Sequence, residues 1–508
     1  MWRISTRSLL CDALLLTLWA SSAGLVVIHE HGRLWGGGVR PLTSLTPTFD
    51  VQEQWFGLYY GNQKVGYANT RMAPQERAGM PGVSMTDQGR VQLALLGLPQ
   101  RIDLSATAFI DADLRLQEFT ATVQTEAYRL KWTGYRQGDD LVLVLTTGES
   151  TVTRRLRDPA GNAMVGGFGS WLAFHELSVG QWGEAWLLNP LSLGPETVHF
   201  TVRREEAQSG ERALVVETDV RGLTTTSWVT RDGRVLKEES PMGWMLIQEP
   251  PQVAMAMPTE RTTPLDLLST VAVPIDRPLP DPAALEQLVL LVEGAGPDAP
   301  VHDRSWQTVL PVETLAAYGR TAPARAWCVL QLRRAVVPGR PATTPDAVVH
   351  YAQPSPFIQS DDPRILAKAR DIVGRETDPW RQVSALNRWV YTTLAKRLTV
   401  GLPTAVDVLL SPSGDCHEHT LLFTALARSL GIPARPLAGL VYYHDRFYYH
   451  AWPEVWVGAW VPTDPTLGQP VADCTHVALV EAENESLIGL AKFVGQLRLA
   501  VLEQKGGE

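Results

Sequence analysis

One stretch, residues 411–466, constrains the fold of this chain more than any other part of it. It reads SPSGDCHEHTLLFTALARSLGIPARPLAGLVYYHDRFYYHAWPEVWVGAWVPTDPT. A loop leads to Cys416, an apolar helix is predicted to follow as far as Leu430, and Gly431 ends it. Cys416 is therefore expected at a helix N-terminus, where the helix dipole and unpaired N–H groups favour a thiolate over a thiol.

Two predicted strands that follow this helix carry two further groups capable of acid–base chemistry. Residues 448–457 alternate apolar and polar positions, and residues 459–462 form a second short strand after a turn. Pairing across this turn places His450 directly opposite Asp464, so that both side chains point to the same face. A shift of one residue would separate them, so the prediction depends on the register. With that register His450 can take a proton from Cys416 while Asp464 orients the imidazole, which makes a Cys-His-Asp nucleophilic triad.

The same residues carry a resemblance to a known family. The segments GDCHEHTLLFTALARSLGIPARPLAG, HAWPEVWV and WVPTDPT resemble the three core motifs of the transglutaminase-like superfamily. The resemblance covers residues 355–480 and implies a papain-like α+β domain. It also implies the roles of nucleophile for Cys416, of general base and then acid for His450, and of orienting residue for Asp464. A membrane-tethered, exported β region followed by such a core is similar to bacterial members of the superfamily.

The resemblance implies an enzyme that works on amide bonds of a protein or peptide through a thioester intermediate. Water resolves the thioester to give hydrolysis, and an amine such as lysine resolves it to give a cross-link. We expect hydrolysis, as in a protease or amidase. A cross-linking transglutaminase and a catalytically silent scaffold protein of the cell envelope are the alternatives. The sequence does not predict the oligomeric state.

Four residues near the predicted triad are expected to line a substrate groove. They are Trp452, Glu454, Trp456 and Trp460. For the tryptophans the alternative is simple packing on alternate faces of the strands, and for the glutamate an ordinary surface position.

A zinc site is the competing interpretation of this region. It would use the side chains of Cys416, His419, Cys474 and His476, which are residue types that bind zinc. This alternative leaves His450 without a role, so we expect neither a metal nor a cofactor.

The cysteine count and the net charge exclude other classes of protein. The four cysteines, at positions 11, 328, 416 and 474, form no CxxC pair, which excludes a zinc ribbon or a thioredoxin-type redox site. A net charge of −9 argues against nucleic acid as a partner.

The N-terminus contains an uncharged apolar run, residues 13–28, preceded by Arg3 and Arg7. The run is slightly shorter than the roughly 20 residues of a membrane-spanning helix. We expect an uncleaved membrane helix with the bulk of the chain extracytoplasmic, because the run continues past the small residues 21–23. Secretion after signal cleavage at those residues, and a buried N-terminal helix, are the alternatives.

The remaining sequence predicts a multidomain chain with an N-terminal membrane helix, antiparallel β-rich regions and a C-terminal α+β transglutaminase-like domain. Asp-Pro pairs at 362–363 and 378–379 predict the starts of two helices. Residues 487–502 fit either an amphipathic helix or a strand. The expected segments are 1–33 (membrane anchor or signal), 34–50 (linker), 51–250 (antiparallel β domain), 251–345 (Pro-rich boundary and small β module), 355–480 (catalytic domain) and 481–508 (C-terminal tail).

Overall fold

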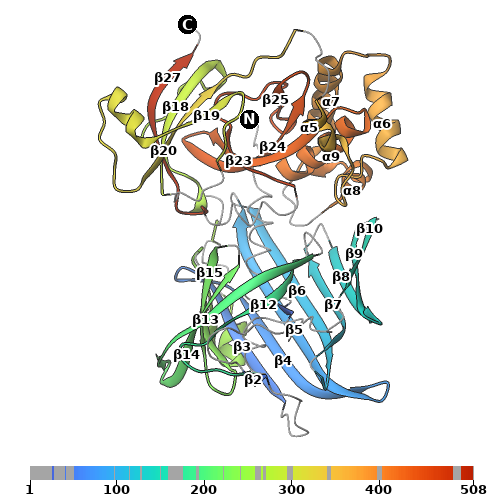
Figure 1. Cartoon of the computed structure of the whole chain (residues 1–508), viewed down its shortest axis with the longest axis vertical. Helices are drawn as coiled ribbons and strands as arrows, with labels where there is room; N and C mark the ends of the chain where they lie inside the picture. Colours follow the sequence, from blue (N-terminus) through green and yellow to red (C-terminus); the bar gives the residue numbers. More distant parts are fainter. Residues whose placement is uncertain are drawn as a thin grey trace. The chain divides into compact units, whose positions relative to one another are not determined.

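The computed structural model of the chain divides into two compact units, which are described separately (Figure 1). One consists mainly of Leu14–Thr147 and Thr151–Leu267, and the other mainly of Leu268–Glu508. The residues that the structure describes are 26–27, 40–41, 51–95, 98–113, 115–125, 129–148, 150–157, 175–189, 194–220, 222–240, 242–257, 265–266, 270–294, 301–339, 345–397, 403–483 and 493–506.

The first unit is built on one fifteen-stranded sheet with the order β1-β12-β13-β14-β15-β16-β17-β3-β4-β5-β6-β7-β8-β9-β10. Its strands are β1 (Val26–Val27), β3 (Gln52–Tyr60), β4 (Gln63–Arg77), β5 (Met80–Leu95), β6 (Leu98–Asp111), β7 (Leu116–Gln124), β8 (Arg129–Gln137), β9 (Asp140–Thr147), β10 (Ser150–Arg157), β12 (Trp182–Asn189), β13 (Gly194–Gln208), β14 (Glu211–Val220), β15 (Leu223–Val229), β16 (Val235–Glu239) and β17 (Trp244–Gln248). Outside this sheet, β2 (Arg40–Pro41) pairs with β11 (His175–Glu176), and a short helix, α3 (Pro251–Met255), follows β17.

The sheet is antiparallel because consecutive strands join through tight turns. The turn at Gly61 between β3 and β4 uses a positive φ of 55°, and the Asp232-Gly233 turn lies between β15 and β16. Side chains alternate between buried and exposed positions along strands such as β7. The antiparallel β-rich architecture expected from the alternating sequence is confirmed.

The predicted membrane segment lies almost wholly outside the described residues. Its last part, Val26–Val27, forms β1 and pairs with Leu187 and Trp186 of β12, so these two residues are extended rather than helical. Within the described part of the chain, no helix combines the length and the apolarity that a membrane crossing requires. The predicted linker over 34–50 likewise lies outside the described residues except for β2.

The second unit contains a four-stranded antiparallel sheet with the order β19-β20-β18-β27. These strands are β18 (Leu285–Glu293), β19 (Gln307–Leu310), β20 (Ala326–Arg333) and β27 (Arg498–Gly506). The expected C-terminal tail over 481–508 therefore differs from the structure, because its residues from Arg498 onward form a sheet strand. Leu499 and Val501 are buried along β27, and Val501 pairs with Leu290 of β18.

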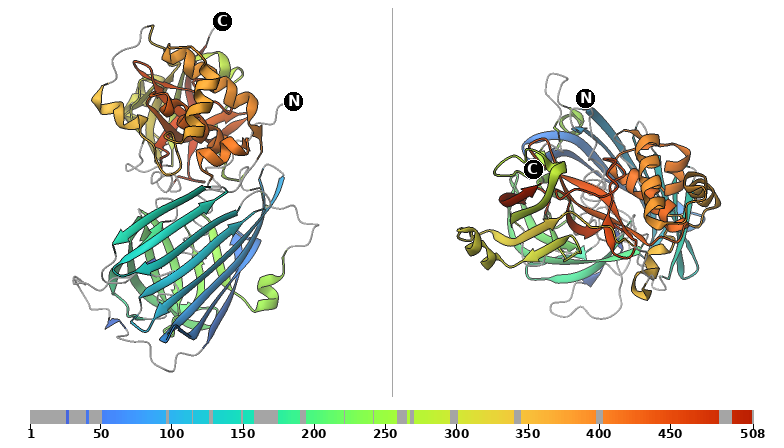
Figure 2. Two further views of the ribbon diagram at one scale, coloured as in Figure 1. Left: turned by 90° about the vertical axis from the view of Figure 1, so that its right-hand side faces the viewer. Right: turned by 90° about the horizontal axis from the view of Figure 1, so that it is seen from above.

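The other sheet of this unit has the order β25-β24-β23-β26 and packs against helices. Figure 2 shows the helices (orange) gathered beside these strands. The elements are α5 (Asp346–Val349), α6 (Pro363–Val373), α7 (Pro379–Thr393), β21 (Ala395–Lys396), α8 (Ala405–Leu410), β22 (Ser413–Gly414), α9 (Cys416–Ser429), β23 (Ala434–Tyr443), β24 (Arg446–Trp456), β25 (Trp460–Pro462) and β26 (Val477–Glu481).

Helix α9 lies at the centre of this arrangement, in contact with α6, α7, α8 and strands β23 and β24. Nearly all of its residues are buried, which accounts for the apolar sequence on every side of the helix. The helix starts predicted from the Asp-Pro pairs are confirmed. Asp362 accepts a hydrogen bond from the N–H of Arg364, and Asp378 accepts one from the N–H of Arg381.

Candidate active site

Cys416 is the first residue of α9, as the sequence predicts, and its side chain is fully buried. The helix begins with a capping box. The Asp415 side chain accepts a hydrogen bond from the N–H of His417 at 3.1 Å, and the Glu418 side chain accepts one from the N–H of Asp415 at 2.8 Å. These contacts hold the first turn of α9 in place, with the positive end of the helix dipole at the thiol.

Gly414 permits the sharp entry of the chain into α9. Its φ is +155°, a conformation that residues with a Cβ rarely adopt. A Cβ at this position would also lie 2.4 Å from the Cβ of Glu418, a member of the capping box. The chain leading to Cys416 therefore requires a glycine for both conformational and steric reasons.

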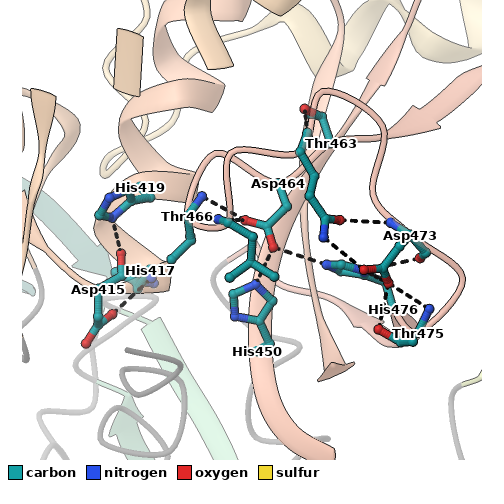
Figure 3. A network of polar contacts seen from close by, with 12 residues as sticks. Asp415, His417, His419, His450, Thr463, Asp464, Thr466, Asp473, Thr475 and His476 are labelled. Atoms are coloured by element: carbon teal, nitrogen blue, oxygen red, sulfur yellow. Dashed lines mark hydrogen bonds and ion pairs between the residues drawn. The ribbon is translucent and has the colours of Figure 1, made fainter. Parts of the chain in front are cut away.

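His450 in β24 and Asp464 just after β25 are joined by a hydrogen bond of 2.7 Å between Nε2 and Oδ2 (Figure 3). The register differs from the predicted one, since Glu454 pairs with Pro462 and Trp456 with Trp460. Extending this register places Asp464 opposite Trp452, two residues away from His450. Because side chains repeat every two residues along a strand, the two groups still share a face and meet diagonally.

The carboxylate of Asp464 is fully buried and accepts four hydrogen bonds. Oδ1 accepts from the backbone N–H groups of Thr466 and Leu467, at 2.7 and 2.9 Å. Oδ2 accepts from His450 and, at 3.1 Å, from Nε2 of His476. Burial by itself would raise the pKa of Asp464, but its interactions with the two histidines outweigh burial and hold that pKa well below its usual range.

The partner of Nε2 determines the tautomer of His450. A carboxylate only accepts hydrogen bonds, so Nε2 carries the proton and Nδ1 of the neutral ring carries the lone pair. Nδ1 is buried and has no hydrogen-bond partner among the residues that the structure describes. The ring therefore offers a proton acceptor on the side away from Asp464.

The first turn of α9 lies close to this histidine–aspartate pair. Helix α9 packs against β24, which carries His450. Burial lowers the pKa of His419 to about 4, and the charge of Asp464 acts on it in the opposite direction. Cys416 and His419 belong to the same first turn of the helix.

Two of the four zinc ligands considered from the sequence make other contacts. Sγ of Cys474 donates a hydrogen bond to the carbonyl of Leu285, and Nδ1 of His419 bonds the carbonyl of Asp415 at 2.5 Å. In the described part of the chain, the ligand atoms of His450, Asp464 and His476 do lie within 4.8 Å of one another.

The side chains of His450, Asp464 and His476 are of types that could hold a metal, but the distances between them are those of hydrogen bonds. The two ring nitrogens lie 2.7 and 3.1 Å from the shared carboxylate oxygen of Asp464. At these distances each ring nitrogen can donate a hydrogen bond to that oxygen.

The family model of the transglutaminase-like superfamily matches residues 367–465. This region is transglutaminase-like. The match includes the start of α9, His450 and Asp464, and it confirms the resemblance inferred from the sequence motifs. No curated protein matches the chain significantly.

Three solved structures resemble the chain weakly. A candidate cysteine protease from Cytophaga hutchinsonii is 15% identical, with a TM-score of 0.29, over 42% of this chain and 82% of that one. A DUF1089 family protein from Pseudomonas aeruginosa is 16% identical, with a TM-score of 0.17, over 42% and 98%. A candidate protease from Parabacteroides distasonis is 10% identical, with a TM-score of 0.19, over 65% and 70%. These superpositions are too weak to bear on function.

The expected groove residues in the transglutaminase-like region fall into two groups. Trp452 and Glu454 are fully buried, so neither faces an open groove in this structure. The Trp452 ring stacks on His450 at 5.9 Å and contacts His476 edge-on at 5.0 Å between ring centroids. Trp456 and Trp460 are half-buried and pack edge to face at 5.7 Å. A groove formed by this pair stays a prediction.

The carboxylate of Glu454 is a buried centre of ion pairs. Its Oε2 lies 3.0 Å from Arg304 and 2.9 Å from Arg435, and its Oε1 accepts a hydrogen bond of 2.8 Å from Trp306 Nε1. The guanidinium of Arg435 also lies over the ring of Trp460 at 4.1 Å. These contacts join β24 to the segment before β19, so Glu454 has structural partners in place of the predicted groove position.

The cysteines differ in their surroundings. Cys328, Cys416 and Cys474 are buried and free of disulfide bonds in the described structure. Burial raises the pKa of Cys328 and of Cys474 to about 12. Of these three described cysteines, only Cys416 lies at a helix N-terminus.

Sequence analysis missed the involvement of His476, which it considered solely as a zinc ligand. The signal available was its position shortly after Asp464, in the segment that leads into β26. Its neighbour Asp473 contacts Nδ1 of the same ring at 3.2 Å.

Proposed function

We propose that the chain is a cysteine-nucleophile enzyme that cleaves or transfers amide bonds of a protein or peptide. Cys416 is the nucleophile, His450 is the general base and then the general acid, and Asp464 orients His450. The observation that carries the proposal is the orientation of His450. Its Nε2 donates to Asp464, and its Nδ1 has no hydrogen-bond partner among the described residues. The strand that carries His450 packs against the helix that begins at Cys416.

The mechanism follows from these groups. Nδ1 of His450 takes the thiol proton as Sγ of Cys416 attacks the amide carbonyl carbon, which gives a tetrahedral oxyanion. The backbone N–H of Cys416, at the start of α9, is a donor for this oxyanion. The C–N bond then breaks, His450 returns the proton to the departing amine, and the acyl group stays on sulfur as a thioester.

The second half of the reaction decides between hydrolysis and cross-linking. In hydrolysis, His450 takes a proton from water as the hydroxide oxygen bonds to the acyl carbon; the C–S bond then breaks, and His450 returns the proton to Sγ, which leaves a carboxylic acid and the free thiol. An amine in place of water would give a new amide. We favour hydrolysis, with a protein or peptide as substrate and no cofactor.

We also propose that the chain is exported and membrane-anchored through residues 13–28, or secreted after cleavage there. The apolar sequence supports this proposal. Membrane fractionation of the full chain, beside a variant with Leu15 and Leu16 changed to Arg, tests it. Recovery of the unmodified chain in the soluble cytoplasmic fraction would contradict both forms of the proposal.

Trapping of the acyl-enzyme tests the function directly. The full chain is incubated with peptide-based electrophiles and peptide esters, and the adduct is located by mass spectrometry. We expect the adduct on Cys416 and none in Cys416→Ala, while Cys328→Ala serves as a matched control that keeps it. Uniform slow labelling of all cysteines would favour the catalytically silent scaffold instead. Addition of a lysine analogue then separates the outcomes, since a cross-linking enzyme transfers the acyl group to the amine.

A further inference from the structure

His476 meets hydrogen-bond acceptors with both of its ring nitrogens. Nε2 lies 3.1 Å from Oδ2 of Asp464, while Nδ1 lies 3.2 Å from Oδ1 of Asp473 and 3.2 Å from the carbonyl of the same residue. The ring is fully buried, and Trp452 packs edge-on against it. The partners of both ring nitrogens are therefore oxygen atoms of the protein.

This arrangement determines the charge of the ring. A neutral imidazole carries one N–H, so it can donate from one nitrogen only. Carboxylate and carbonyl oxygens accept and do not donate, so two such partners require two N–H groups. His476 is therefore an imidazolium, held between two carboxylates.

The electrostatics agree with this geometry. Burial by itself would lower the pKa of His476, but the hydrogen bonds and charges of Asp464 and Asp473 raise it to about 9. The hydrogen bond and charge of His476, together with hydrogen bonds from Thr475, outweigh burial and lower the pKa of Asp473 to about 2. The cation and its two anions thus stabilise one another in the interior.

We propose that His476 is a positioning residue for the reaction: a permanent cation that holds the Asp464 carboxylate in place and neutralises its charge, so that His450 stays unprotonated and able to accept the Cys416 proton. This inference rests on the proposed function.

The reason is the balance of charge around His450. A lone buried carboxylate beside an imidazole favours the imidazolium, which cannot act as a base. His476 places a counter-charge directly on the Asp464 carboxylate, while the hydrogen bond from His450 to Asp464 is kept; the second carboxylate, Asp473, contacts the ring through its other nitrogen, Nδ1. The centroids of the two histidine rings are 5.9 Å apart, close enough for a strong mutual effect.

Other charged or titratable groups face this cluster from neighbouring elements. Burial lowers the pKa of Lys396 on β21, and the charge of Asp464 opposes that effect. Helix α9 contributes its first turn, with Cys416, His417, Glu418 and His419. These groups are the same in every variant considered, so a difference between variants reports on His476.

The test measures the rate of Cys416 alkylation by iodoacetamide against pH in the full chain. Removing the buried cation makes protonation of His450 easier and the thiolate of Cys416 less stable. We therefore expect the midpoint of the profile to move up by about 1–2 pH units in His476→Gln, from Coulomb's law at an effective dielectric constant near 20. The exposed hairpin residue His444, changed to Gln, is the matched control and should leave the midpoint unchanged.

Several outcomes would overturn the inference. A purely structural role would lower the rate at every pH without moving the midpoint. If His476→Gln fails to fold, His476→Asn removes the same cation and is expected to move the midpoint in the same direction, and an unmoved midpoint there overturns the inference too. In the wild type, ¹⁵N NMR of labelled histidines should find both nitrogens of His476 protonated at pH 7.5, and a neutral ring would be equally decisive.

Failure of the proposed function gives a different result. In that case Cys416 of the wild type would react no faster than Cys328, whatever the state of His476. Reactive Cys416 with an unmoved midpoint would instead contradict only the inference about His476.

Discussion

The side chains of His450 and Asp464 are joined by a hydrogen bond of 2.7 Å, and neither has any exposed surface. A carboxylate accepts and does not donate, so this hydrogen bond selects one tautomer of the neutral histidine. The first two predictions below concern the chemistry that depends on this pair, and the others concern the structure that supports it.

The first prediction concerns cysteine reactivity. Because burial raises the pKa of Cys328 and of Cys474 to about 12, both stay thiols at neutral pH. We expect iodoacetamide to label Cys416 ahead of both of them at pH 7, as measured by peptide mass spectrometry of the native chain. Cys416→Ala should remove the fast label without lowering the melting temperature. Fast labelling of Cys474 in that variant would contradict the prediction.

The second prediction concerns Asp464→Asn. The asparagine Oδ1 can still accept from Thr466 and Leu467, but the variant loses the anion beside His476 and should be less stable than the wild type. The NH₂ group of the asparagine donates toward Nε2 of His450 and favours the wrong tautomer. We expect the rate of Cys416 acylation to fall by about 10³–10⁴-fold, the scale known for this substitution in a triad. Asp445→Asn, at an exposed position, is the control, and a loss below tenfold in Asp464→Asn would contradict the assigned role.

The third prediction concerns stability at alkaline pH. The folded-state pKa of His476 is raised from 6.5 to about 9, so its stabilising effect is complete below pH 6.5. That effect is lost as pH rises through 9, because the folded state must then release a proton that it binds more tightly than the unfolded state does. The free energy of unfolding should fall by about 3 kcal/mol over this range.

Urea unfolding at a series of pH values measures this dependence. His444→Gln should keep the slope between pH 6.5 and 9, whereas His476→Gln should flatten it. An equal slope in both variants would mean that another group is responsible.

The fourth prediction concerns the buried ion pairs of Glu454. Glu454→Gln leaves the guanidinium groups of Arg304 and Arg435 without a buried counter-charge. We expect a loss of about 3–5 kcal/mol in the free energy of unfolding. Glu481 pairs with the same Arg435 but is 37% exposed. Glu481→Gln should therefore lower the free energy of unfolding by less than about 1 kcal/mol. Denaturant unfolding measures both, and equal losses would contradict the argument from burial.

The fifth prediction compares two glycines at the ends of α9. Gly414→Ala places a Cβ against Glu418, so we expect both a lower melting temperature and slower alkylation of Cys416. At Gly431 the φ of +79° strains an alanine, but no atom lies within 4 Å of the added Cβ. Gly431→Ala should cost about 1 kcal/mol of stability and leave alkylation unchanged. Normal alkylation in a folded Gly414→Ala variant would show that the entry loop does not position the thiol.

Features of the fold that depend on neighbouring residues were accessible from the sequence. The Asp-Pro pairs before α6 and α7 place a capping carboxylate and a compatible proline at adjacent positions, and both helices begin there. The start of α9 at Cys416 and its end before Gly431 follow from the same local chemistry. Alternation along the strands indicated the antiparallel β-rich part for the same reason.

Features of the fold that depend on pairing between segments far apart in the sequence could not be predicted from the sequence. Strand β27 pairs with β18, and apolar alternation in residues 487–502 alone could not distinguish such a strand from an amphipathic helix. The register of β24 and β25 differs from the expected one by two residues. A shift of two residues leaves each side chain on the expected face of the sheet, because side chains repeat every two residues along a strand. His450 and Asp464 therefore still meet.

The order of chemical groups along the chain, with a cysteine at a helix start and a histidine and an aspartate on a hairpin, was determined by the sequence itself, because caps, turns and strand alternation are local. The tertiary structure alone decided that His476 shares the Asp464 carboxylate and that Glu454 is buried between two arginines. Those contacts depend on which segments pack together, and packing is selected by the burial of the whole unit rather than by any short stretch of residues.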